Sequence, residues 1–201
     1  MTTHSVTDHS HGHHHDGPDA KATFGFWIYI MTDCMMFAAL FATYIVLRNN
    51  TYGGPGITLI SNLHDVLARS IVLLVMVLTS GLSMVAMHRQ SVCKTQFWLI
   101  ISFLIGLLFL GMQYQEFDCV FKMGYTWQSN AFMSAYFTTV GLFCVHIVVV
   151  LLWTVILMIQ LAMQKFSSMM QTRLICLNMF LNFLSIIWIF VFSIVYLMGA
   201  I

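Results

Sequence analysis

The stretch that decides the fold is Ala131–Met163, AFMSAYFTTVGLFCVHIVVVLLWTVILMIQLAM, which contains no Asp, Glu, Lys or Arg. As an α-helix rising ~1.5 Å per residue it would be roughly 50 Å long, whereas the hydrocarbon core of a bilayer is about 30 Å thick. An uncharged apolar stretch of this length is typical of a membrane-spanning helix. We therefore expect a transmembrane helix that tilts strongly or projects from the bilayer.

Similar apolar segments make up most of the remaining chain. Of the 201 residues, 60% are hydrophobic and only 7% are charged, which excludes a soluble globular enzyme because too little polar surface is available to face water. The formal charge of +1 and the lack of any Lys/Arg cluster exclude nucleic acid as a partner. The sequence predicts an all-α polytopic membrane protein, with one domain over 23–201 that is a bundle of five transmembrane helices at about 24–47, 66–87, 96–117, 131–163 and 174–198.

Residues 1–22 are polar and contain six of the nine histidines. Nothing apolar in this tail could be buried, so we expect it to be disordered. It also lacks the pattern of a cleaved signal peptide. The histidines could bind Zn²⁺, Ni²⁺ or Cu²⁺ loosely, but a solvated tract is the simpler interpretation.

The placement of Lys and Arg predicts the orientation. With five spans, the N-terminal tail and the connections after the second and fourth spans share one side of the membrane. That side carries Lys21, Arg89, Lys94, Lys165 and Arg173, whereas the other carries Arg48, Arg69 and Lys122. The bias favours a cytoplasmic N-terminus and a periplasmic C-terminus.

Four ionisable residues lie inside the predicted spans, where each should face protein or water: Asp33, Arg69, Glu116 and His146. Asp33 is ~13 Å along its helix, too deep for its short side chain to reach the surface. It is either a proton-linked or lipid-contacting carboxylate, or a protonated residue that fixes helix packing. A single intramembrane histidine such as His146 is more often a hydrogen-bonded core residue than a ligand.

The spacing of the other polar residues predicts contacts between helices. Gln113 and Glu116 are three residues apart and share a helix face. An ion pair between Glu116 and Arg69 is geometrically allowed, because both lie near the same end of their spans, and a structural role is favoured. In the fifth span, spacings of four and seven place three more residues on one face, where they could hydrogen-bond to other helices: Asn178, Asn182 and Ser185.

These residues do not provide a redox centre. A haem or copper site in a helical bundle needs two or more inward-facing ligands. The spans contain one histidine, and their cysteines show no paired spacing. We therefore expect no catalytic residue, no metal site and no bound cofactor in this chain.

Four separated segments resemble one family: FGFWIYIMTDC at 24–34, GMQYQEF at 111–117, FLSIIW at 183–188 and VYLMG at 195–199. They are similar to subunit III of haem–copper oxidases, in the five-span form found in cytochrome o ubiquinol oxidases. The resemblance implies a non-catalytic subunit of a proton-pumping quinol terminal oxidase in the aerobic respiratory chain of a bacterial inner membrane. Haems and copper would belong to the catalytic subunit I.

The resemblance also implies partners and roles. The chain would pack against subunit I and other oxidase subunits, bind membrane phospholipids between its helices, and support assembly, stability and sustained proton uptake. The family's buried carboxylate matches Asp33, its Gln/Glu pair matches Gln113 and Glu116, and the second histidine of its fourth-span motif matches His146.

Four positions depart from the family pattern. Phe143 and Asn182 stand where the family usually has histidine, and Ser185 stands where it has an acid. Arg69 occupies a position that is usually polar or acidic. Most of these changes remove titratable side chains and so disfavour a proton-linked role shared by the polar residues. They are more compatible with a scaffold role, because helix packing tolerates substitutions that conserve volume.

Two alternatives stay open. One is an accessory subunit of a nitric oxide reductase. The other is a stand-alone transporter that uses Asp33 and His146 as a proton relay. The chain has no internal repeat and no proline within a predicted span, and secondary transporters commonly have such repeats and broken helices.

Overall fold

The computed structural model describes residues 18–48, 63–124, 126, 128–164 and 168–197, and these are almost entirely helical. Five of the helices are long and apolar enough to cross a membrane, and no strand occurs among the described residues. The all-α fold with five candidate membrane spans is therefore confirmed. The helices are α1 (Pro18–Leu47), α3 (Leu63–His88), α4 (Val92–Lys122), α5 (Ala131–Gln164) and α6 (Ser168–Val191), with a π-helical segment η1 (Phe192–Leu197) directly after α6.

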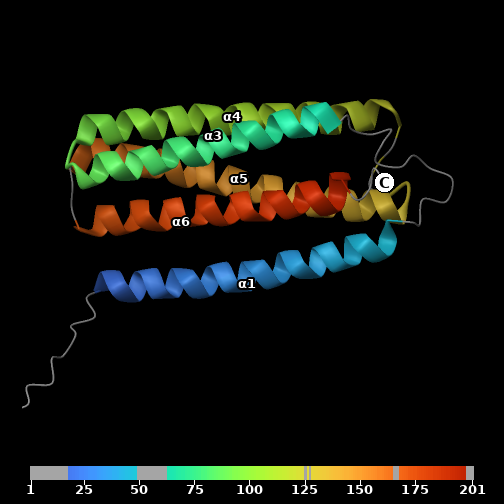
Figure 1. Cartoon of the computed structure of the whole chain (residues 1–201), viewed down its shortest axis with the longest axis horizontal. Coiled ribbons are helices and arrows are strands. Elements are labelled where there is room, and N and C mark those ends of the chain that lie inside the picture. The colour runs from blue at the N-terminus through green and yellow to red at the C-terminus, as the bar shows by residue number, and fades with distance from the viewer. Residues whose placement is uncertain (1–17, 49–62, 125, 127, 165–167, 198–201) are drawn as a thin grey trace, which may run out of the picture.

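The five helices lie side by side, and successive helices run in opposite directions (Figure 1). The closest pairing is between α3 and α4, while α5 and α6 complete a four-helix group. Helix α1 is the outlying member and packs mainly on α5 and α6. As a result, the N-terminal end of α1 lies at the same end of the bundle as the turn between α3 and α4.

Several helices extend past the predicted spans, because hydropathy falls at the membrane surface before the helical hydrogen bonding stops. Helix α4 continues to Lys122, whose ammonium pairs with Asp118 at 2.6 Å one turn earlier. It ends before Gly124, which has a φ of 82° and donates its N–H to the carbonyl of Phe121 at 3.0 Å. Of the tail predicted to be disordered at 1–22, residues 1–17 lie outside the described residues, but residues 18–22 form the start of α1, so the prediction is wrong for that part. The glycine-rich connection at 53–56 also lies outside the described residues.

A tight turn joins α3 to α4. Gln90 has a φ of 56°, and its N–H donates to the carbonyl of Met87 at 2.8 Å. The N–H of Ser91 reaches back to the carbonyl of Ala86 at 3.3 Å. This pair of bonds is the Schellman motif, which satisfies the last carbonyls of a helix and reverses the chain. It sets α3 and α4 antiparallel and in contact along their length.

The centre of the four-helix group is aromatic. Trp188 packs edge-on against Phe109 at 5.1 Å between ring centroids and lies 5.0 Å from Phe143. The Trp188 indole N–H donates to the Ser70 hydroxyl at 2.9 Å, so its polar atom is satisfied. Phe143 is fully buried. Position 143, where the family usually has histidine, is therefore an apolar core position in this chain.

Candidate functional site

Five polar side chains from four elements meet at one end of the bundle, and we call them the Arg69 cluster. Both oxygens of the Glu116 carboxylate pair with the Arg69 guanidinium, and the Nη2–Oε1 distance is 3.0 Å. The same guanidinium donates to Gln113 Oε1 at 3.1 Å, and the Gln113 amide donates in turn to Glu116. The Tyr196 hydroxyl donates to Glu116 Oε2 at 3.0 Å and lies 3.4 Å from the hydroxyl of Tyr136.

The cluster is buried, and each of the three Arg69 nitrogens has a hydrogen-bond acceptor. Arg69 is 2% exposed and Glu116 is 8% exposed. The remaining Arg69 donor, Nε, reaches the Asp65 carbonyl at 3.3 Å, and the guanidinium carbon lies 5.6 Å from the centroid of the Tyr196 ring. A buried ion pair of this kind is tolerated only when further hydrogen bonds satisfy its remaining atoms. The geometry thus suits a clamp that joins α3, α4, α5 and η1.

A second buried pair joins α1 to α5. Asp33 Oδ1 lies 3.2 Å from Nε2 of His146, and both residues are less than a tenth exposed. The rings of Phe37 and Phe180 flank the imidazole at centroid distances of 5.3 and 6.1 Å. The second oxygen, Oδ2, has no hydrogen-bond partner, and it is the one such buried side-chain atom among the described residues.

The hydrogen bonds of His146 define how protons are shared in this pair. A carbonyl oxygen only accepts, so Nδ1 must carry a hydrogen to bond the Leu142 carbonyl at 2.8 Å. The contact between Nε2 and Asp33 then needs one more proton, held by either partner. Each arrangement gives a pair without net charge, which suits its apolar surroundings.

The predicted hydrogen-bonding face of α6 forms only in part. Asn178 accepts from the Ser80 hydroxyl of α3 at 3.0 Å, as an interhelical contact should. Asn182 and Ser185 behave differently, because each donates to a carbonyl of its own helix, at 2.9 and 2.7 Å. Asn182 is exposed on the outer surface of the bundle. Within this chain, neither Asn182 nor Ser185 forms the predicted hydrogen bond to another helix.

The spacing of polar residues in the sequence predicted no role for three tyrosines that complete contacts between the helices. Tyr196 and Tyr136 join the Arg69 cluster, and Tyr44 of α1 donates its hydroxyl to the carbonyl of Val195 in η1 at 3.1 Å. All three are buried. Their signal in the sequence is a phenol hydroxyl inside an apolar span, which must find an acceptor when it is buried.

No metal centre can be built from the described residues, which contain no group of three or more His, Cys, Asp or Glu side chains placed to hold an ion. The histidines of the tail lie outside the described residues. The expectation that haem and copper belong to partner subunits therefore stays a prediction.

Comparison with known proteins identifies the family. Residues 4–200 match the family model for cytochrome c oxidase subunit III. The cytochrome bo(3) ubiquinol oxidase subunit 3 of Pseudomonas aeruginosa is 42% identical over 96% of this chain and 91% of its own length. The protein of the same name from Pseudomonas putida is 38% identical over 88% and 85%, respectively. The cytochrome c oxidase subunit 3 of Bacillus subtilis is 34% identical over 88% and 86%. With its five apolar helices, the chain therefore belongs to subunit III of the haem–copper oxidases, a family of multi-pass membrane proteins.

Proposed function

We propose that this chain is the non-catalytic subunit III of a quinol-oxidising, proton-pumping terminal oxidase in a bacterial inner membrane. The observation that carries the proposal is the 42% identity, over nearly the whole chain, to a cytochrome bo(3) ubiquinol oxidase subunit 3. In this role the chain packs against subunit I, contacts phospholipids, and supports assembly, stability and sustained proton uptake. Haems and copper are held by the partner.

The buried polar residues support a scaffold role. In the Arg69 cluster the two opposite charges pair with each other and are hydrogen-bonded inside the chain. These groups therefore hold the helices of this chain together. The Asp33–His146 pair is held between α1 and α5 among aromatic rings. Interactions of this kind fix the packing of helices in a membrane, where the hydrophobic effect between helices is absent.

The charge distribution supports a cytoplasmic N-terminus. Arg69 is buried in an ion pair rather than exposed at a connection, so it no longer counts among the charges that face the periplasm. Without it, the Lys/Arg bias toward the side of the N-terminal tail increases. The domain division into a cytoplasmic tail at 1–22 and a transmembrane part at 23–201 belongs to the same proposal.

The test is to purify the native complex through an affinity tag on this chain and to record its visible spectrum and quinol oxidase activity. We expect haem bands and oxidation of ubiquinol with reduction of oxygen. A colourless preparation of this chain alone would contradict the proposal and favour the stand-alone transporter. Haem bands with nitric oxide reduction and no quinol oxidase activity would favour the accessory subunit of a nitric oxide reductase.

A second measurement tests the absence of cofactors in this subunit. The chain separated from the complex and refolded in detergent should retain no haem, because paired axial ligands are missing from its spans. Stoichiometric haem in the separated chain would contradict the non-catalytic assignment.

A further inference from the structure

Asn182 has an unusual position for an amide side chain. It lies near the middle of the apolar segment Met169–Leu197, with its side chain exposed on the outer surface of the bundle. Its amide N–H₂ donates to the Asn178 carbonyl at 2.9 Å, but its Oδ1 accepts no hydrogen bond from the described residues. The exposed hydroxyls of Thr32 and Thr43 also donate to carbonyls of their own helix, but these side chains carry no further carbonyl oxygen. An amide oxygen left facing hydrocarbon is unfavourable, because lipid tails offer no donor.

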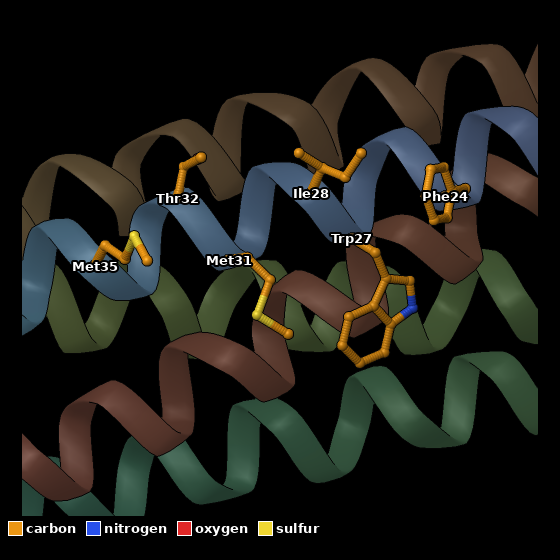
Figure 2. A pocket seen from close by; sticks show the side chains of 6 residues that line it. All are labelled: Phe24, Trp27, Ile28, Met31, Thr32 and Met35. Atoms are coloured by element: carbon orange, nitrogen blue, oxygen red, sulfur yellow. The ribbon is translucent and has the colours of Figure 1, made fainter.

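The residue lines a groove between α1 and α6 with a volume of about 430 Å³. Helix α1 contributes Trp27, Met31 and Cys34 to its wall, while α6 contributes Asn182 and Phe183 beside further apolar side chains. Figure 2 shows Trp27 and Met31 leaving α1 on the side that faces α6. We call this feature the α1–α6 groove.

The groove continues onto an exposed apolar face of α1. Trp27 and Met31 also border a shallow depression lined by residues of α1 alone, whose side chains Figure 2 shows spaced along the helix: Phe24, Trp27, Ile28, Met31, Thr32 and Met35. Met35 is 77% exposed. Together the two surfaces present a broad apolar area in which the Asn182 oxygen is a polar acceptor.

We propose that the α1–α6 groove seats a transmembrane helix of another subunit, which donates a hydrogen bond to Oδ1 of Asn182. This rests on the proposed function, since it requires an oxidase complex. An acyl chain fills an apolar groove equally well but has no hydrogen to donate. A helix has such donors in its Ser, Thr, Asn, Gln, Tyr or Trp side chains, and interhelical hydrogen bonds of this type stabilise membrane assemblies.

A second copy of this chain fits the groove less well. In a symmetric dimer each copy would have to insert its own exposed α1 face into the partner's groove, and such a dimer includes none of the other oxidase subunits that the proposed function requires. A convex helix from a different subunit instead inserts its side chains into the groove, as ridges pack into grooves between helices in general.

Cys34 provides a native position for testing the proposal, because it is exposed and lines the groove. The photoreactive amino acid p-benzoyl-phenylalanine would be incorporated in place of Cys34 during synthesis, so that the probe is already present when the tagged oxidase complex assembles. Irradiation should crosslink it to a transmembrane peptide of another subunit, identified by mass spectrometry. The matched control is the same probe in place of Cys119, which is exposed on α4 and should not label that peptide.

Asn182→Leu then tests the hydrogen bond. It should lower the Cys34 crosslinking yield several-fold, whereas Asn182→Gln, which keeps an amide, should retain most of it. An unchanged yield for Asn182→Leu, a Cys34 product with phospholipid or a second copy alone, or equal labelling of the peptide from Cys119 would overturn the proposal. These failures would occur in a complex that still shows haem bands, so they are distinct from a failure of the proposed function.

Discussion

The Arg69 cluster and the Asp33–His146 pair are both buried ionisable contacts between helices, but they differ in how completely they are partnered. In the cluster, both carboxylate oxygens of Glu116 accept hydrogen bonds and four elements are joined. In the pair, one contact of 3.2 Å holds α1 against α5, and Oδ2 of Asp33 is left without a partner. The difference shows that the polar network of the four-helix group is closed, whereas the polar pair that joins α1 to α5 leaves one buried acceptor without a partner.

The largest expected effect is that of Arg69→Met. It leaves Glu116 buried without its cation, so the free energy of unfolding should fall by ~3–5 kcal/mol. The change would be measured by unfolding in mixed detergent–dodecyl sulfate micelles. The double variant Arg69→Met with Glu116→Gln should recover most of the loss, since no lone charge is then buried. Additive effects in this double-mutant cycle would show that the two residues are not coupled.

The next prediction tests how tightly the four-helix group is packed around Gly106. A Cβ at Gly106 would lie 2.6 Å from Leu151 Cδ2 and 3.0 Å from Met76 Cε, so Gly106→Ala overpacks the four-helix group and should cost ~1–3 kcal/mol. Gly111 is on the same helix and has no atom within 4 Å of its added Cβ. Gly111→Ala is therefore the control and should be neutral or stabilising. Equal losses at both positions in the same unfolding assay would count against tight packing at Gly106.

Loss of the Asp33–His146 contact should act mainly on α1. Asp33→Leu leaves Nε2 of His146 unpaired in an apolar environment, which should cost ~1–3 kcal/mol. Hydrogen–deuterium exchange in the intact complex should show faster exchange in residues 24–47, while α4 is unchanged. A uniform increase over all five helices would contradict the view that this contact mainly attaches α1.

The smallest structural effect concerns the polar face of α6. Ser80→Ala removes the hydroxyl that bonds to Asn178 across the helix interface and should cost ~0.6 kcal/mol, the average for such bonds in membranes. Ser185→Ala is the matched control, because that hydroxyl bonds only to the Asn182 carbonyl of its own helix. If Ser185→Ala destabilises the chain as much as Ser80→Ala, the distinction between the two positions is wrong.

Much of the fold follows from the sequence, because span length and hydropathy alone define the five helices. Helix α5 is the clearest case, since its uncharged stretch begins at Ala131 and so does the helix. The helix ends were harder to predict. The connection-side end of α4 is charged, yet the helix continues to Lys122, where the exposed pair with Asp118 adds a small stabilisation. Hydropathy does not report such hydrogen bonding.

The two polar sites also differ in how far the sequence alone predicts their contacts. Gln113 and Glu116 share a face by spacing alone, so their approach to Arg69 could be anticipated. The contact between Asp33 and His146 links residues 113 positions apart, and it depends on α1 packing beside α5, which one sequence does not reveal. For Asn182 and Ser185 the spacing indicated a shared face but not which way that face points.

We infer that the chain acts as a scaffold rather than as a carrier of catalytic protons, and Asp33→Asn tests this inference most directly. The asparagine amide can donate to Nε2 of His146, so the hydrogen bond survives while the titratable proton is lost. In the purified complex we expect an unchanged haem spectrum and initial rate of oxygen consumption, with at most faster loss of activity during turnover. An intact complex whose oxygen consumption is abolished by Asp33→Asn would contradict the account, because the Asp33 carboxylate would then be an obligatory proton carrier.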